Sequence, residues 1–312
     1  MLTDSLLILA IKLFQQFVRI LPENGQQGVG VFFGRIAFYI LKKRQSIAIT
    51  NIKRVFSNSD VSWQKRTAKK CFENMGTNFI ELLLVPYLSR AEYNLRFSID
   101  DRQFADEALK VHRGLIALVF HYANWEIMGI TSRFFENDVI ALARPLKKHV
   151  KLNNFLNSLR ISTGLKILPN INTSRDIMRC LKEDNIIAIL ADQREKRSRG
   201  VFVELFGEKV PTSRGIAMIG MKTGAPVIPF YLVRKGFLRY TLVCGESIDM
   251  ERKGDIEELI HKNTRKINAF LETIILKHPE EWFWVHRRWG RDASTRRGGG
   301  SSKPLFSVKD GV

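Results

Sequence analysis

The sequence is poor in the residue types that stabilise small secreted or metal-bound domains. Its 312 residues include only three cysteines, Cys71, Cys180 and Cys244, which lie far apart and form no CxxC or paired Cys/His spacing. This usage fits a reducing compartment and argues against a disulfide framework or a zinc finger. A chain of this length buries a sizeable core without either device. We therefore interpret the cysteines as small buried apolar residues.

Acidic residues are scarce relative to basic ones. The chain has 31 Asp and Glu against 50 Lys and Arg, a formal net charge of +19. Such an excess predicts an anionic partner, whether nucleic acid, an anionic membrane surface or an acidic protein. The basic residues are spread along the chain, and the signatures of RNA-recognition sheets, zinc fingers and basic zippers are absent. We expect no nucleic-acid partner.

The sequence also lacks a long uninterrupted apolar run. Residues 4–22 are mostly apolar, but polar side chains recur at i, i+3, i+4 and i+7, which gathers them into one stripe of a helix. These are Lys12, Gln15, Gln16 and Arg19. A second apolar stretch, residues 29–44, is too short to cross a bilayer. We expect residues 1–45 to be membrane-anchoring helices that lie in the headgroup region or span with the stripe packed on protein; two amphipathic helices packed on the core are the alternative.

Glycines at positions 25, 28, 30 and 34 raise the question of a phosphate-binding loop. No strand precedes them and no GK[ST] follows, as such a loop requires. We interpret them as small residues in an apolar helix pair.

From residue 115 onward, helix and strand signals alternate. Apolar runs predict strands at residues 115–120, 139–143, 165–168, 186–190 and 227–233. Periodic segments predict helices near residues 124–136, 147–163, 174–183, 213–223 and 255–277. This alternation indicates an α/β fold with a mostly parallel central sheet flanked by helices. We expect this domain to cover residues 46–291, and residues 292–312, rich in Gly, Ser and charge, to be disordered.

The stretch "VFHYANWEIMG", residues 119–129, places a histidine at the end of a predicted strand. Ligands of parallel sheets bind beyond the carboxyl ends of the strands, so His121 is positioned for function. A helix starting near Asn124 would bring Glu126 within reach of the imidazole, where a hydrogen bond would fix its tautomer and leave the other ring nitrogen as a base. Its amino-terminal N–H groups would face a developing oxyanion. An ordinary strand-end histidine fits the same H-x4-E pattern.

Other strand ends carry polar residues that would meet at the same edge. In "ALARP" a predicted strand ends with Arg144, and in "IIAILADQR" another ends with Asp192, Gln193 and Arg194. Arginine binds phosphate and carboxylate groups bidentately. No HExxH or comparable ligand spacing occurs, so we expect no metal.

Six motifs in order give the chain a family resemblance. They are "HYANWE", "ARP", "LADQR", "GVFVELFG", "APVIPFY" and "HPEEWFWVHRRWG". In order and spacing they resemble the bacterial lipid A late acyltransferases, the lauroyl and myristoyl transferases of the lysophospholipid acyltransferase superfamily, which complete lipid A on the cytoplasmic face of the inner membrane. The resemblance covers roughly residues 1–290.

The resemblance implies an acyltransferase domain of the glycerolipid-acyltransferase type, with an amino-terminal membrane anchor. His121 and Glu126 would be the catalytic pair. Ala123 stands where many members have glycine. The substrate-binding residues would be Asn124, Arg144, Asp192, Gln193, Arg194, Arg287 and Arg288, with the arginines directed at acceptor phosphates.

The resemblance also implies substrates and partners. The donor would be an acyl thioester on acyl carrier protein or coenzyme A, a co-substrate rather than a bound cofactor. The acceptor would be a hydroxyl of an anionic lipid A precursor at the inner membrane, acylated without an acyl-enzyme. Relatives that acylate other glycolipids, such as phosphatidylinositol mannosides, or lysophospholipids share the H-x4-D/E pattern, and a noncatalytic basic protein is a further alternative.

Overall fold

The computed structural model of the chain describes residues 2–143, 148–169 and 174–290. A seven-stranded sheet in the order β1-β9-β8-β2-β5-β3-β4 forms its centre. Its strands are β1 Phe97–Asp100, β2 Leu115–Val119, β3 Val139–Ala143, β4 Lys166–Pro169, β5 Ile186–Leu190, β8 Val227–Gly236 and β9 Arg239–Cys244. The strand pairs are parallel except for β8 with β9. The mostly parallel central sheet predicted from the sequence is confirmed.

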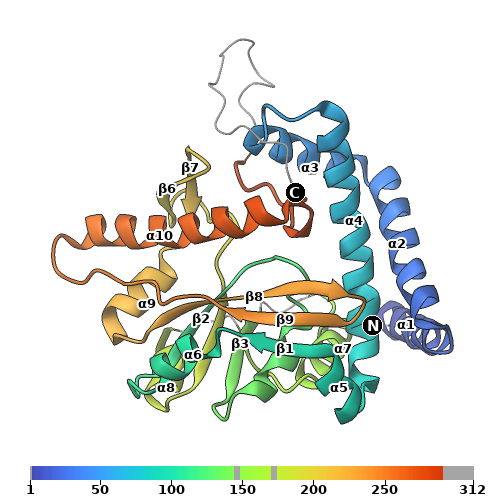
Figure 1. Cartoon of the computed structure of the whole chain (residues 1–312), viewed down its shortest axis with the longest axis horizontal. Helices are drawn as coiled ribbons and strands as arrows, with labels where there is room; N and C mark the ends of the chain where they lie inside the picture. Colours follow the sequence, from blue (N-terminus) through green and yellow to red (C-terminus); the bar gives the residue numbers. More distant parts are fainter. Residues whose placement is uncertain (1, 144–147, 170–173, 291–312) are drawn as a thin grey trace.

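Helices surround this sheet (Figure 1). They are α1 Leu2–Arg19, α2 Glu23–Ile40, α3 Lys42–Val55, α4 Val61–Leu84, α5 Arg90–Arg96, α6 Arg102–Leu109, α7 Val150–Ile161, α8 Ser174–Lys182, α9 Gly215–Thr223 and α10 Ile256–Lys277. The short 3₁₀ helices are η1 Val85–Tyr87, η2 Met128–Phe134 and η3 Pro279–Glu281. Figure 1 shows α4 and α2 upright at one end of the sheet and α10 lying across it. The three cysteines are buried and free, as predicted.

Several elements differ from the sequence predictions. Residues 124–136 form turns and the 3₁₀ helix η2 instead of an α-helix that starts at Asn124. The short strands β1 and β9, and the antiparallel hairpin of β6 Val201–Leu205 and β7 Glu208–Thr212, were not predicted. Arg144 and the tail 292–312 lie outside the described residues, so the phosphate-binding role of Arg144 and the disorder of the tail stay predictions.

The amino-terminal helices pack closely because glycines line their contact. A Cβ on Gly34 would come within 2.3 Å of the carbonyl oxygen of Phe72, and a Cβ on Gly76 within 2.2 Å of the carbonyl oxygen of Gly30. Backbone of α2 therefore touches backbone of α4. This confirms the interpretation of Gly30 and Gly34 as small residues of an apolar helix pair. In the ranges that the structure covers, no helix is both long and apolar enough to cross a membrane.

This contact yields a stability prediction. Gly76→Ala should lower the free energy of unfolding by about 1–3 kcal/mol, because the added methyl group overlaps the backbone of α2. Gly28→Ala on α2 is the matched control, since a Cβ there meets nothing within 4 Å. That change should leave stability equal or raise it by up to about 1 kcal/mol, the helix preference for alanine. Urea unfolding measures both, and equal midpoints would contradict the packing described.

Candidate active site

His121 lies at the sheet edge where strand pairing brings it to a carboxylate. Strands β2 and β5 are parallel neighbours, with Val119 paired to Leu190. Two residues beyond that pair, on both strands, come His121 and Asp192, and the imidazole Nδ1 lies 2.7 Å from Asp192 Oδ1. The backbone N–H of His121 also donates to Asp192 Oδ2, at 3.1 Å. The sheet register therefore builds this pair.

Asp192 is held on its other side by an indole. The Nε1–H of Trp282 donates to Asp192 Oδ2 at 2.8 Å. Asp192 is 3% exposed and the His121 residue 9% exposed, so the pair is shielded from water. With Nδ1–H donated to Asp192, the imidazole Nε2 is the acceptor, and it lies 3.0 Å from the side-chain amide nitrogen of Gln193. Because Gln193 itself is exposed, its amide can move aside and free Nε2.

The two charges of the pair stabilise each other. Burial lowers the pKa of His121, but the charge and hydrogen bond of Asp192 and the charge of Glu126 outweigh it, so this pKa is raised. Burial raises the pKa of Asp192, but the charge and hydrogen bonds of His121, with the Trp282 hydrogen bond, hold it below its ordinary value. Asp192 is thus an ionised partner that orients the imidazole.

Glu126 does not accept the hydrogen bond that we expected from His121. Its carboxylate receives two hydrogen bonds from Arg160 of α7, at 2.8 and 3.0 Å. The reason is local: without an α-helix starting at Asn124, the Glu126 side chain is directed to α7, and Asp192 occupies Nδ1. Glu126 still acts on His121 through its charge. The sequence placed Asp192 among substrate-binding residues, and only the equal offset from the ends of β2 and β5 signals its actual contact.

An apolar cavity lies beside the imidazole. It is lined mostly by apolar side chains of β2, β3, β5, β8, β9 and η2, has a volume of about 90 Å³ and is partly open to solvent. Trp125 belongs to this lining and its ring lies 5.0 Å from that of His121. Phe135, Leu142 and Phe230 are among the other wall residues. Trp125 therefore connects the imidazole to a space whose apolar walls suit a hydrocarbon chain.

Two residues predicted to bind substrate are interior instead. Asn124 is fully buried and donates to Glu81 Oε2 at 2.7 Å. Arg288 is also fully buried, and its guanidinium donates to the carbonyl of Pro211 and to the Thr212 hydroxyl. Burial lowers the pKa of Arg288 to about 10. Neither side chain is placed to meet a ligand.

Arg194 and Arg287, the remaining predicted phosphate ligands in the described ranges, are partly exposed. The backbone N–H of Arg194 donates to His286 Nε2 at 3.0 Å, close to the catalytic edge. Burial lowers the pKa of His286 to about 4, so this ring is neutral and accepts that bond. Over the same ranges, no three His, Cys, Asp or Glu side chains gather as a metal site needs.

The site thus combines a buried histidine–aspartate pair at a sheet edge, an arrangement suited to general-base chemistry, with an apolar cavity that Trp125 connects to the imidazole. Residues 3–291 match the family described as bacterial lipid A biosynthesis acyltransferase. The chain belongs to this family, and it is an O-acyltransferase acting on lipid A or another glycolipid.

Individual relatives are distant but cover most of the chain. The lipid A biosynthesis palmitoleoyltransferase of Escherichia coli is 22% identical over 268 residues, 84% of this chain and 83% of that protein. The lipid A biosynthesis lauroyltransferase of the same organism is 21% identical, with 84% of each covered. The phosphatidylinositol mannoside acyltransferase of Mycolicibacterium smegmatis is 23% identical over 90% of this chain and 91% of its own.

The histidine–aspartate pair gives a prediction that NMR can test. In Asp192→Asn the pKa of His121 should fall, because the carboxylate charge that raises it is gone while burial still lowers it. The imidazole resonances of His121, followed against pH, measure this. Asp184→Asn is the matched control, since Asp184 accepts from His112, an exposed histidine elsewhere, and it should leave the His121 titration unchanged.

The same substitution should change stability in a defined pH window. The raised pKa of His121 adds stability that is complete below its unfolded value, about 6.5, and disappears as pH rises through the folded value. The lowered pKa of Asp192 adds stability above its unfolded value, about 3.9, which is lost as pH falls. The wild type should therefore exceed Asp192→Asn most between about pH 4 and 6.5. An advantage that does not vary with pH would contradict this assignment.

Proposed function

We propose that this protein transfers a fatty acyl chain from the thioester of acyl carrier protein to a hydroxyl of a lipid A precursor, at the cytoplasmic face of the inner membrane. The observation that carries the proposal is the His121 imidazole, fixed by Asp192 on one nitrogen and in contact with Trp125, which lines an apolar cavity. The family and the lipid A relatives support the acceptor class.

The mechanism uses the neutral imidazole that carries its proton on Nδ1, which leaves Nε2 free to accept a proton. Nε2 of His121 takes the proton of the acceptor hydroxyl as its oxygen attacks the thioester carbonyl, and Asp192 stabilises the resulting imidazolium. Backbone N–H groups of the turn at residues 124–126 donate to the oxyanion. When the C–S bond breaks, Nε2 returns the proton to the departing thiolate. No acyl-enzyme forms, because the acceptor supplies the nucleophile.

In this mechanism Glu126 is not hydrogen-bonded to the base and acts on it only through its charge. Its charge raises the pKa of His121 from a distance, while its two hydrogen bonds hold Arg160 near the cavity. The catalytic pair of the H-x4-E pattern is thus coupled through charge, and Asp192 supplies the orienting contact.

Charge supports an acidic carrier protein as the donor, with acyl coenzyme A as the alternative. The net charge is +19, and the segment that follows Gln193 exposes Lys196, Arg197 and Arg199. These cations follow Gln193, whose amide contacts the His121 imidazole, so a docked acidic carrier there would deliver its thioester near the base.

A second acceptor class is favoured by one relative. The mannoside acyltransferase matches a larger share of this chain than the lipid A enzymes do. A phosphatidylinositol mannoside or a similar glycolipid is therefore the alternative acceptor.

The proposal predicts a product and a required base. Protein in detergent, given acyl carrier protein thioesters and the tetra-acylated disaccharide precursor, should form a product heavier by one acyl group, detected by mass spectrometry. His121→Ala should reduce this rate by at least ~10²-fold, the usual loss for a general base. His112→Ala, which changes an exposed histidine, should keep wild-type activity.

Parallel reactions separate the alternatives. Product only from a phosphatidylinositol mannoside, or only from a lysophospholipid, would replace lipid A as acceptor. Turnover only with acyl coenzyme A would replace the carrier protein as donor. Near-native transfer by folded His121→Ala would refute the mechanism.

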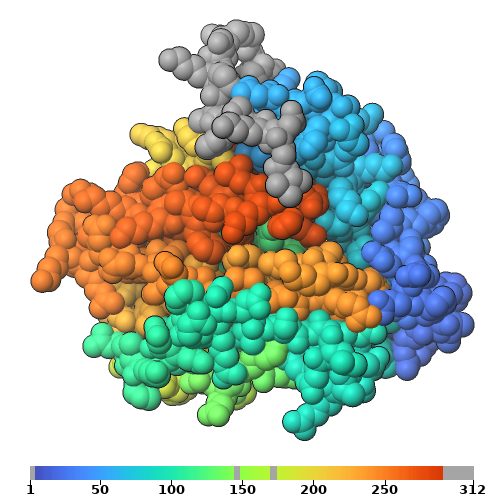
Figure 2. Space-filling view, in the orientation of Figure 1, coloured from blue at the N-terminus to red at the C-terminus, as the bar shows by residue number. Residues whose placement is uncertain are grey.

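We also propose that α1 and α2 attach the protein to the membrane surface. Their apolar side chains include many that stay exposed: Leu6, Leu7, Leu9, Leu13, Phe17, Phe32, Phe33, Ile36, Tyr39 and Ile40. Figures 1 and 2 show these helices, in blue, forming one end of the molecule. An apolar surface of this extent beside Lys42 and Lys43 suits the headgroup boundary of an anionic bilayer.

Membrane attachment predicts a loss of vesicle binding in Leu13→Glu/Phe17→Glu. Each buried apolar side chain contributes about 1.5–3 kcal/mol, so co-sedimentation with anionic phospholipid vesicles should weaken by more than about tenfold. Ile256→Glu is the control, because Ile256 is equally exposed but begins α10, at the opposite end of the molecule (Figure 1). If both variants bind as the wild type does, the apolar face of α1 is not the attachment surface.

A further inference from the structure

The loop that carries His121 contains a residue in an unfavourable conformation. Ala123 has a φ of 49°, in the left-handed region that favours glycine. For other residues this conformation costs about 1–2 kcal/mol and persists where surrounding contacts impose it. Its N–H donates to the carbonyl of Glu281 at 2.9 Å, and its carbonyl accepts from Asn78 Nδ2 at 2.6 Å. Both the N–H and the carbonyl of Ala123 are therefore hydrogen-bonded to residues outside the loop.

These hydrogen bonds are connected to a fully buried carboxylate, that of Glu81 in α4. Its Oε2 accepts from Asn124 Nδ2 at 2.7 Å and from the Tyr240 hydroxyl at 2.6 Å. Its Oε1 accepts from Arg234 Nη1 at 3.0 Å and from the backbone N–H of Leu238 at 2.8 Å. Four donors, from the loop and from the β8–β9 hairpin, thus converge on one carboxylate.

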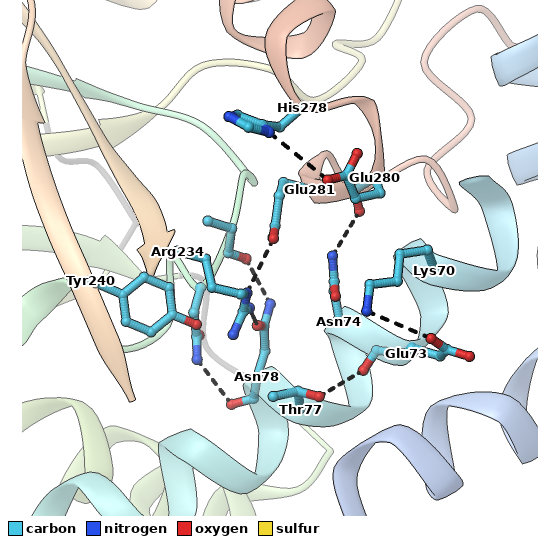
Figure 3. A network of polar contacts seen from close by, with 12 residues as sticks. Lys70, Glu73, Asn74, Thr77, Asn78, Arg234, Tyr240, His278, Glu280 and Glu281 are labelled. Carbon is cyan, nitrogen blue, oxygen red and sulfur yellow. Dashed lines mark hydrogen bonds and ion pairs between the residues drawn. The ribbon is translucent and has the colours of Figure 1, made fainter. Parts of the chain in front are cut away.

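Arg234 connects the Glu81 carboxylate to Glu281 and Asn78, the two residues that hydrogen-bond to the backbone of Ala123. Its guanidinium also donates to Glu281 Oε1 at 3.1 Å and to Asn78 Oδ1 (Figure 3). Burial lowers the pKa of Arg234, but the charges of Glu81, Tyr240 and Glu281 outweigh it and raise this pKa, so the cation is permanent. Glu81, Arg234, Asn78 and Glu281 form one connected unit, which we call the loop clamp.

The loop clamp bears on the base through the backbone. Ala123 follows His121 by two residues, and the His121 carbonyl accepts from the N–H of Phe283 at 3.0 Å. Residues 121–123 and 281–283 therefore run antiparallel, and the loop clamp fixes the far end of that pairing. A shift of Ala123 would move the imidazole relative to the cavity, while Asp192 remained attached to β5.

Stability alone does not account for such a cluster. Replacing a buried ion pair by apolar residues is frequently neutral or stabilising, since desolvation offsets the attraction. A buried hydrogen-bonded network instead specifies one arrangement of the chain, and here both oxygens of Glu81 are satisfied by two donors each. The arrangement specified here is the loop that bears His121.

We propose that Glu81 is a positioning residue for acyl transfer: through Asn124 and Arg234 it holds the 121–124 loop in the conformation that aims the His121 imidazole at the thioester. It touches neither substrate nor reacting atoms. The inference rests on the proposed function in that His121 is the base.

The test is Glu81→Gln against Glu73→Gln. Glu73 lies on the same helix and pairs with Arg35 at 2.7 Å, but it belongs to neither the loop nor the loop clamp. Glu81→Gln removes the charge and turns a donor toward donors, so kcat should fall about 10- to 100-fold, the scale for a misplaced catalytic group. The KM for the thioester should stay within about twofold, because the cavity is unchanged. Glu73→Gln should keep both constants.

A second variant covers the case in which Glu81→Gln does not fold. Asn78→Ala removes the donor to the Ala123 carbonyl without changing any charge, and it should also lower kcat. Adding Ala123→Gly should restore part of that loss, because glycine adopts a positive φ without being held there. A purely structural role for Asn78 predicts no such recovery.

The outcomes separate the two proposals. Wild-type kcat in folded Glu81→Gln, or equal losses in Glu81→Gln and Glu73→Gln, would overturn the positioning role while leaving His121 as the base. Asn78→Ala with no loss, or a loss that Ala123→Gly does not lessen, would overturn it as well. Activity retained in His121→Ala would instead remove the proposed function on which the inference rests.

Discussion

The hydrogen bond between His121 Nδ1 and Asp192 Oδ1 is the interaction on which the rest of the site depends. It is built by the sheet, because β2 and β5 pair in parallel and each supplies the residue two positions beyond Val119 and Leu190. Parallel sheets place such ends together at one edge, which is where they bind ligands. This hydrogen bond fixes the proton of the neutral imidazole on Nδ1. In the proposed mechanism Nε2 is then the nitrogen that accepts the proton of the acceptor hydroxyl.

The surroundings of this pair keep it rigid and dry. The indole of Trp282 donates a hydrogen bond to the second oxygen of Asp192, and the ring of Trp125, which lines the apolar cavity, packs against the imidazole. The loop between them is bent at Ala123 into a conformation that alanine does not prefer. Strain at a functional loop persists when neighbouring contacts over-determine it, and here α4, β8 and η3 supply those contacts.

The sequence predicted the features that arise from local pattern or chain order. Apolar runs located β2 and β5, and the position of His121 after the first run located the catalytic edge. Glu126 was assigned the wrong contact because the prediction required an α-helix from Asn124, whereas this segment forms turns and η2. Asn124 and Arg288 were predicted to bind substrate, yet both are fully buried. Their hydrogen-bond partners come from α4, β7 and α10. These elements lie far away along the chain, so no local spacing rule predicts the contacts. Glu81 gave no signal, because a glutamate near the end of a helix is ordinary until β8 and β9 fold against it.

Two carboxylates, those of Asp192 and Glu126, act on the pKa of His121, and only Asp192 contacts the imidazole. A general base works best with a pKa near the pH at which the enzyme operates. Asp192 already raises the pKa of His121 against the opposing effect of burial. A second carboxylate in direct contact would raise it further and leave the imidazole protonated, unable to accept the hydroxyl proton. Pairing Glu126 with Arg160 compensates most of its charge nearby, so its influence on the imidazole is limited to a weaker effect at longer range. In the proposed mechanism the H-x4-E spacing then places a compensated carboxylate within electrostatic range of the imidazole, and the neighbouring strand β5 leads into the residue that orients it.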